Sequence, residues 1–218
     1  TEWTNVAKAK PLFKGHYQPK VPADLGFYDL RLSETREQQA LLAREAGVDA
    51  FCYWHYWFGN GKRILERPFK EVLESGKPDF PFCLGWANHS WYAKTWNKDS
   101  KDKLLIEQTY TGVEDAREHF NYLLKAFKDS RYLKIDGKPY LFIFDPVSLP
   151  DIYIKKFTEW AQEQGYPGLY LVANISPYED KDEYIRKGYL AGEIDEVLIV
   201  FNHMVNAGEQ RLVTKTTL

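Results

Sequence analysis

The chain has 218 residues, with 31 acidic and 29 basic side chains and a formal net charge of −2. This balance argues against a dedicated nucleic-acid-binding protein, which normally carries a basic excess. No apolar run approaches the roughly 20 residues of a membrane helix. We therefore expect no nucleic-acid partner and no transmembrane segment. Aromatic residues are unusually frequent, since Trp, Tyr and Phe make up 16% of the chain.

Residues 1–31 show no clear periodicity and are rich in proline, glycine and aromatic residues. We expect an irregular segment lying over a core, because disordered segments are poor in aromatics. From Ser33 onward, helical and apolar segments alternate. Helices are predicted over residues 33–46, 68–73, 112–128, 150–164 and 178–187. Strands are predicted over residues 48–54, 80–86, 140–144, 169–173 and 197–201, and a long irregular loop over residues 87–103.

The predicted strands are continuously apolar, as in a parallel sheet covered on both faces. No GxGxxG or Walker loop is present, which argues against a Rossmann or P-loop domain. Polar and aromatic residues instead follow each strand, and this is where a TIM-type barrel places its active site. The alternation of helices and strands predicts an α/β chain. Because such a barrel has eight strands and five are predicted, we expect a single partial (β/α)8 TIM-type barrel domain over residues 1–218.

A dense series of motifs points to a known family. In chain order these include Thr1-Glu2-Trp3-Thr4-Asn5-Val6, Lys14-Gly15-His16-Tyr17-Gln18-Pro19, Phe51-Cys52-Tyr53-Trp54-His55-Tyr56-Trp57-Phe58, Trp86-Ala87-Asn88 and Arg131-Tyr132-Leu133-Lys134-Ile135-Asp136-Gly137-Lys138-Pro139. Over its first two thirds the chain resembles the WbsX-type glycosyltransferase family. That family is in turn similar to the endo-alpha-mannosidase-like glycoside hydrolases, which have a (β/α)8 barrel.

The resemblance implies a carbohydrate-active enzyme domain that makes or breaks glycosidic bonds of a polysaccharide, in a surface-polysaccharide or lipopolysaccharide context. It also implies a first strand and late strands that are missing here, including a late motif that holds the catalytic carboxylates. We therefore assign no catalytic residue, and a non-catalytic carbohydrate-binding remnant or inactive fragment stays open. His89 stands where relatives carry a glutamate. The expected location is cytoplasmic or membrane-peripheral, and no cofactor is expected.

Aromatic residues cluster after two of the predicted strands. They are Tyr53, Trp54, Tyr56, Trp57, Trp86, Trp91 and Trp96. Sugar rings stack on aromatic planes, and their hydroxyls need polar partners nearby. The cluster is therefore equally consistent with carbohydrate contact and with simple core packing. The candidate substrate-binding residues are Tyr53, His55, Tyr56, Trp57, Trp86, Asn88, His89, Trp91, Asp145, Asn174, Asn202 and His203.

Four further expectations concern individual side chains. Convergence of His55, His89 and His203 with Asp145 would form a zinc site, but the usual ligand spacings are absent and we expect no metal. Cys52 and Cys83 are predicted to be buried thiols, and His16 and His119 to be surface or loop residues. Trp57→Ala is predicted to weaken glycan binding with little loss of fold, unless Trp57 belongs to the core.

Overall fold

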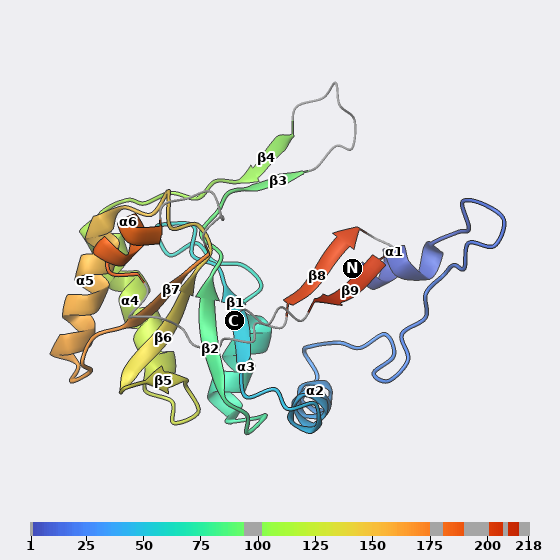
Figure 1. The fold of residues 1–218 in the computed structure, drawn as a ribbon, viewed down its shortest axis with the longest axis horizontal. Coiled ribbons are helices and arrows are strands. Elements are labelled where there is room, and N and C mark those ends of the chain that lie inside the picture. The colour runs from blue at the N-terminus through green and yellow to red at the C-terminus, as the bar shows by residue number, and fades with distance from the viewer. Residues whose placement is uncertain (1, 94–101, 175–180, 190–200, 207–208, 214–218) are drawn as a thin grey trace.

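The computed structural model describes residues 2–93, 102–174, 181–189, 201–206 and 209–213 (Figure 1). Its centre is a sheet in which four strands run parallel in the order β1-β2-β6-β7, with the short β5 antiparallel to β6. These strands are β1 (Phe51–His55), β2 (Phe82–Trp86), β5 (Lys134–Ile135), β6 (Lys138–Ile143) and β7 (Tyr170–Ala173). The first four predicted strands are thus confirmed, and their spatial order follows the chain.

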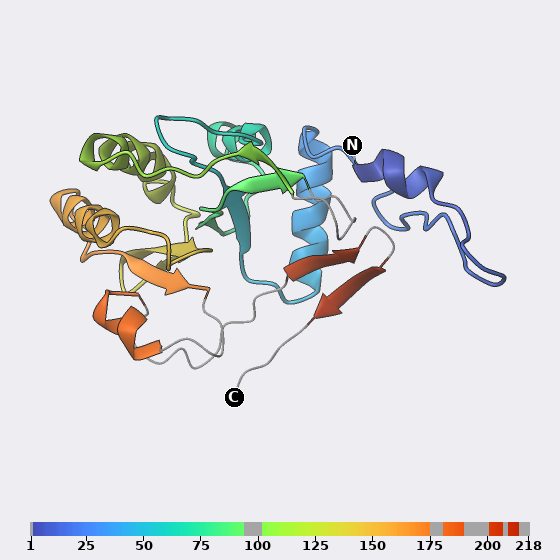
Figure 2. The same cartoon turned by 90° about the horizontal axis from the view of Figure 1, so that it is seen from above.

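Helices link successive parallel strands and lie along one side of the sheet (Figures 1 and 2). The linking helices are α3 (Arg67–Ser75), α4 (Val113–Phe127) and α5 (Asp151–Glu163), while α2 (Ser33–Glu45) precedes β1 and α6 (Lys181–Arg186) follows β7. Pro68 suits the first turn of α3 because its missing N–H is not needed there. Gly76 ends α3 at φ 70°, a left-handed conformation that glycine adopts without penalty.

The main core lies between the sheet and these helices. Alternate strand residues such as Phe82, Leu84 and Trp86 point to this side, which we call the helix face. Phe69 of α3 meets Phe82, with ring centroids 5.6 Å apart, and Phe157 of α5 stacks on Trp86 at 6.3 Å. In α4, apolar residues at helical spacing supply the middle of this core: Ala116, Phe120, Leu123 and Phe127.

The opposite side of the sheet, which we call the open face, is less covered. On β1 it carries Cys52 and Trp54, which are exposed, whereas the next residue His55 is buried on the helix face. The prediction that Cys52 is buried is therefore wrong, and only Cys83 is buried. Both thiols lie on the open face, but Cys52 is in β1, the last strand of the described sheet, whereas Cys83 is in β2 between β1 and β6.

The N-terminal segment differs from the prediction. Residues Glu2–Lys8 form helix α1, and the segment that follows extends away from the sheet (Figures 1 and 2). Most of its large apolar side chains are exposed, including Phe13 and Tyr17. Trp3 packs edge-on against Phe27 and Tyr28 within the same segment. Its aromatic residues therefore contact one another and do not cover the sheet.

Two other predicted segments also differ. The predicted loop over residues 87–103 contains β3 (Trp91–Ala93), which pairs antiparallel with β4 (Lys103–Ile106), and residues 94–101 lie outside the described chain. Most of the predicted strand over residues 197–201 also lies outside it. Residues Phe201–Asn206 form β8, which pairs antiparallel with β9 (Glu209–Val213) in a sheet of its own. Among the described helices, none is long and apolar enough to span a bilayer.

Candidate functional site

Three aromatic rings meet on the open face near the carboxyl ends of β1 and β6. The Trp54 ring centroid lies 5.9 Å from that of Phe142 and 5.8 Å from that of Phe144, both in edge-to-face geometry. We call these three residues the aromatic platform. Trp54 is 42% exposed and Phe144 36%, so their rings are accessible although they pack on each other. Accessible rings held in place by neighbours suit stacking against the apolar face of a sugar.

Polar groups border the platform. The His89 ring lies 4.8 Å from Phe144, and its Nδ1 is 3.1 Å from the Ser90 carbonyl oxygen. If Nδ1–H donates to that carbonyl, Nε2 remains an acceptor for a hydroxyl group. Asn174 is exposed at the end of β7 and donates to the Phe144 carbonyl oxygen at 3.2 Å. The platform therefore has hydrogen-bonding groups of the kind that sugar hydroxyls need.

Asp145 and Asn88 fix the turn that follows β6. Asn88 is fully buried and donates to the Asp145 carbonyl oxygen at 2.6 Å and to the Tyr110 hydroxyl at 2.9 Å. Its side-chain oxygen accepts from the Asp145 N–H at 2.8 Å. The Asp145 carboxylate accepts from the Ser148 hydroxyl at 2.7 Å and from the Ser148 N–H at 3.2 Å. Asn88 thus positions the turn beside Phe144, and Asp145 stays half-buried at the platform's edge.

We expect Asn88→Ala to destabilise the fold by about 1–3 kcal/mol, because it leaves the N–H and carbonyl groups of Asp145 without their partners. Asn174→Ala is the matched control, since Asn174 is exposed and makes one such contact. It should change stability by about 0.5 kcal/mol or less. Urea unfolding of the three proteins, followed by circular dichroism, measures both values. Equal stabilities for the two variants would contradict the role given to Asn88.

Several of the predicted site residues lie on the helix face. His55 and Trp86 are buried there, and Tyr53 is half-buried against Phe69 of α3, with ring centroids 5.4 Å apart. Trp57, 4% exposed, donates from Nε1 to Asp115 at 2.9 Å. Trp54 was part of the predicted aromatic cluster but not of the twelve candidates. Counting alternate residues along Phe51–His55 would have separated it from Tyr53 and His55.

A buried histidine pair lies under the ends of β1 and β2. The Nε2 atoms of His55 and His119 are 2.8 Å apart, and the His119 ring stacks on Trp57 at 4.7 Å. His119 is fully buried, so its predicted surface position is wrong. It lies on the core stripe of α4, three residues after Ala116 and one before Phe120. No described group forms a hydrogen bond with its Nδ1. A buried acceptor without a hydrogen bond costs less free energy than a buried N–H without one. We therefore assign the proton shared with His55 to Nε2 of His119, which leaves Nδ1 as the unpaired acceptor.

Burial keeps both imidazoles neutral. It lowers the pKa of His55 to about 3, and the nearby Arg63 charge adds to the effect. The pKa of His119 is also well below its usual value, because of burial first and then of His55 and Arg63. The pair therefore acts as a hydrogen-bonded part of the core. The structure places it on the opposite side of the sheet from the aromatic platform.

The remaining candidate residues do not all lie beside the platform. Tyr56 and Trp91 form a half-buried edge-to-face pair, with ring centroids 5.3 Å apart, at the base of the β3–β4 hairpin. Asn202 and His203 lie in β8, opposite Leu212 and Arg211 of the antiparallel β9. Trp96 lies outside the described residues. Tyr56 and Trp91 thus join the same end of β1 and β2 as the platform.

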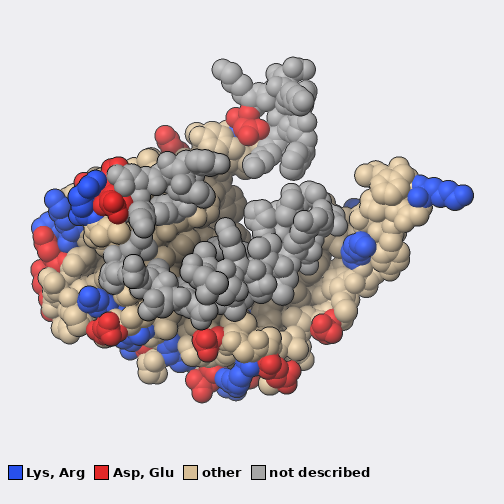
Figure 3. Space-filling model, in the orientation of Figure 1, with Lys and Arg blue, Asp and Glu red and all other residues tan. Residues whose placement is uncertain are grey.

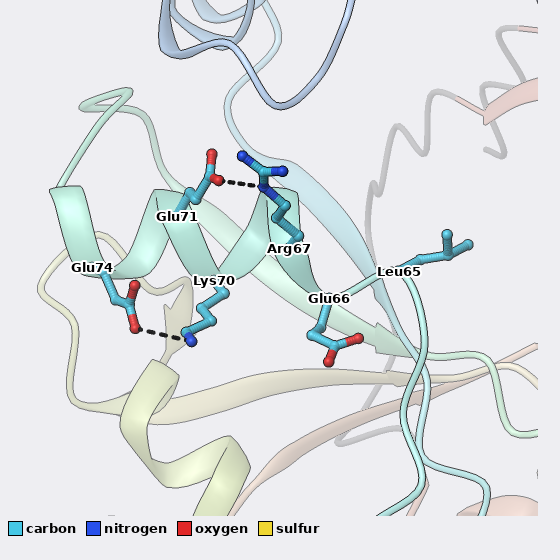
Figure 4. A pocket seen from close by; sticks show the side chains of 6 residues that line it. All are labelled: Leu65, Glu66, Arg67, Lys70, Glu71 and Glu74. Atoms are coloured by element: carbon cyan, nitrogen blue, oxygen red, sulfur yellow. Dashed lines mark hydrogen bonds and ion pairs between the residues drawn. The ribbon is translucent and has the colours of Figure 1, made fainter. Parts of the chain in front are cut away.

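The described residues contain no group of three or more His, Cys, Asp or Glu side chains placed to hold a metal ion. His55 lies on the helix face and His89 on the platform, so the two do not converge in this part of the chain. A surface depression over α3 is lined by Leu65, Glu66, Arg67, Lys70, Glu71 and Glu74 (Figure 4). Arg67 pairs with Glu71 at 2.7 Å and Lys70 with Glu74 at 3.8 Å. These two ion pairs lie on the exposed surface of α3, and the partners in each neutralise one another's charges.

The three rings of the platform, Trp54, Phe142 and Phe144, are uncharged. In the orientation of Figure 1, Lys, Arg, Asp and Glu side chains gather at the margins of the molecule (Figure 3). The middle of this view is free of such side chains wherever described residues are visible (Figure 3). A surface of uncharged rings with a few amide, imidazole and carboxylate groups suits a ligand that carries many hydroxyls and an apolar ring face.

The sequence pattern of the family described as Glycosyltransferase WbsX matches residues 1–213. The chain belongs to this family. The resemblance seen in its motifs is confirmed, and membership places the chain among carbohydrate-active domains. The uncharacterized protein WxcX of Xanthomonas campestris pv. campestris, from strains B100 and ATCC 33913, is 36% identical over 184 residues. This alignment covers 84% of the present chain and 26% of WxcX, so the chain spans about a quarter of that relative.

Two solved structures resemble this one. A glycoside hydrolase-like protein matches with a TM-score of 0.50 and 14% identity, over 87% of this chain and 61% of that protein. The GH99 endo-alpha-mannosidase from Bacteroides thetaiotaomicron matches with a TM-score of 0.48 and 16% identity, over 79% and 46% of the two chains. At this identity the first likeness concerns the fold, a mixed α/β architecture with a parallel sheet.

Proposed function

We propose that this chain is part of a carbohydrate-active enzyme that makes or breaks glycosidic bonds of a polysaccharide, and that the aromatic platform contacts the glycan. The proposal includes the fold expected from the sequence, a single domain that forms part of a (β/α)8 barrel. A chain-ordered row of parallel strands with their connecting helices on one side is typical of such barrels. A doubly wound sheet would instead reverse its strand order and carry helices on both faces.

The position of the platform is the observation that carries this proposal. Trp54 and Phe144 are accessible at the carboxyl ends of β1 and β6, the end at which barrel enzymes bind their substrates. Their neighbours His89, Asp145 and Asn174 bring hydrogen-bonding groups to the same edge. Membership in a glycosyltransferase family and the fold likeness to a glycoside hydrolase-like protein support a sugar as the ligand.

Calorimetric titration with a panel of neutral oligosaccharides, mannose-containing ones included, tests the proposal. We expect Trp54→Ala to weaken the binding of any positive glycan by about tenfold, since ring stacking on an aromatic side chain contributes up to about 1.5 kcal/mol. Tyr17→Ala is the matched control, because it removes another exposed ring, from the N-terminal segment and away from the platform. No heat with any glycan, or equal affinities for the two variants, would overturn the assignment of the platform.

A carbohydrate-binding role without catalysis is the second candidate. Asp145 is the carboxylate beside the platform, and both of its oxygens accept hydrogen bonds from Ser148. Glycosidases of the usual kind need two carboxylic groups across the scissile bond. Product analysis by chromatography separates the two functions. New reducing ends or a transferred sugar from a bound glycan support the enzyme, while binding with an unchanged glycan supports the second candidate.

A further inference from the structure

The aromatic platform depends on a glycine in β2, the strand between β1 and β6. Trp54 of β1 is the register partner of Gly85 in β2, and Gly85 is the partner of Phe142 in β6. The three residues thus form one row across the sheet. Neighbouring strands lie about 4.8 Å apart, so β1 and β6 are separated by about twice that distance. The ring centroids of Trp54 and Phe142 are nevertheless only 5.9 Å apart, because they meet above Gly85.

A side chain at Gly85 would compete with these rings for space. A Cβ atom there would lie 3.3 Å from Cε3 of Trp54, 3.3 Å from Cδ1 of Phe142 and 3.1 Å from Sγ of Cys52. Such distances are shorter than ordinary carbon contacts of about 3.5–4.0 Å, so at least one neighbour would have to move. The backbone gives no other reason for glycine here, since Gly85 is not among the residues with a positive φ.

On the helix face, β2 carries large buried side chains. Leu84 and Trp86, on either side of Gly85, are fully buried against the helices. A glycine within a strand usually weakens it, since it adds backbone entropy and offers no side chain to pack. On the open face, however, the missing side chain lets the Trp54 indole lean across β2 while 42% of it stays accessible.

We propose that Gly85 is a positioning residue for glycan recognition, which holds the Trp54 indole against Phe142 with one face presented to a pyranose ring. This deepens the proposed function and rests on it. Gly85 itself does not contact the sugar. It fixes the depth of the platform and the tilt of the indole, and both decide which part of a sugar ring can stack there.

The test is a double-mutant cycle between Gly85→Ala and Trp54→Ala, read as glycan affinity by calorimetry. We expect Gly85→Ala to weaken binding about tenfold in the native background and to have no further effect in the Trp54→Ala background, because it acts through the indole. Equal losses in both backgrounds would show a general structural effect and overturn the proposal. Cys83→Ala, on the same strand and face one row away, should leave affinity within about twofold of the native protein.

A second measurement does not depend on a glycan. Fluorine NMR of protein labelled with 5-fluorotryptophan resolves the indoles, and the Trp54 resonance is the one lost in Trp54→Phe. We expect Gly85→Ala to shift this resonance and leave that of the buried Trp86 in place. An unchanged Trp54 resonance would refute the positioning role. If no glycan binds the native protein, the proposed function fails with the recognition role, and the resonance still decides whether Gly85 positions the indole.

Discussion

Trp57→Ala is expected to destabilise the protein by about 3–5 kcal/mol, the usual cost of truncating a buried tryptophan. Trp57 is 4% exposed, stacks on His119 and donates to Asp115. Its removal opens a cavity and leaves one Asp115 oxygen without its donor, while the Tyr153 hydroxyl still contacts the other at 3.3 Å. Because domains of this kind have about 5–15 kcal/mol of stability, the variant loses a large share of it.

Urea unfolding monitored by circular dichroism measures this loss, and Trp54→Ala is the matched control from the same segment. Trp54 is 42% exposed, so its truncation should cost about 1 kcal/mol or less. Trp57, a candidate glycan contact in the sequence analysis, is thus expected to support the fold, while Trp54 of the same aromatic cluster is accessible to a ligand. A Trp57→Ala protein as stable as the native one, with impaired glycan binding, would restore the original prediction for Trp57.

Acid is expected to destabilise the fold through the buried histidine pair. Both imidazoles have pKa values in the folded chain that lie below the ordinary value of 6.5, and that of His55 is about 3. The unfolded chain therefore binds more protons below pH 6.5, and stability falls as the pH falls from there toward 3. Above about pH 7 the imidazoles are neutral in both states and add no pH dependence. At pH 5.5 His55 alone costs about 1.4 kcal/mol, and His119 adds a cost of the same sign.

The expected result is a loss of more than about 1.4 kcal/mol between pH 7.5 and pH 5.5, from urea unfolding at a series of pH values. His119→Phe keeps a ring against Trp57 and should weaken this pH dependence, whatever its effect on stability at pH 7.5. His16→Gln removes an imidazole from the N-terminal segment, outside the core, and serves as the control. The same pH dependence in the native protein and in His119→Phe would show that the pair does not titrate as described.

Much of the local structure follows from the sequence. The apolar runs at residues 48–54, 80–86, 140–144 and 169–173 predicted four strands that the structure confirms within about three residues. The helices between them were predicted as well, since their caps, prolines and apolar spacing are local signals. The family was recognisable for the same reason, because its motifs are contiguous stretches of chain.

The candidate site was only partly predictable. Runs of apolar residues show that a strand is buried but not which side chains point to which face, because that depends on what covers each face. Tyr53, His55 and Trp86 were therefore grouped with residues of the opposite side, and His119 was not recognised as their neighbour. Its partner His55 lies 64 positions earlier in the chain, a contact that only packing of α4 on the sheet creates.

The sequence by itself determined the alternation of helices and strands, the family and the abundance of aromatic rings near the ends of two strands. The tertiary structure alone decided which rings are accessible. Pairing of β1, β2 and β6 in one register puts Trp54, Gly85 and Phe142 in a row on the open face, and the helices bury Trp57 and Trp86 on the other. The reason is that a strand's two faces alternate residue by residue, while the covering of a face comes from elements far away in the chain.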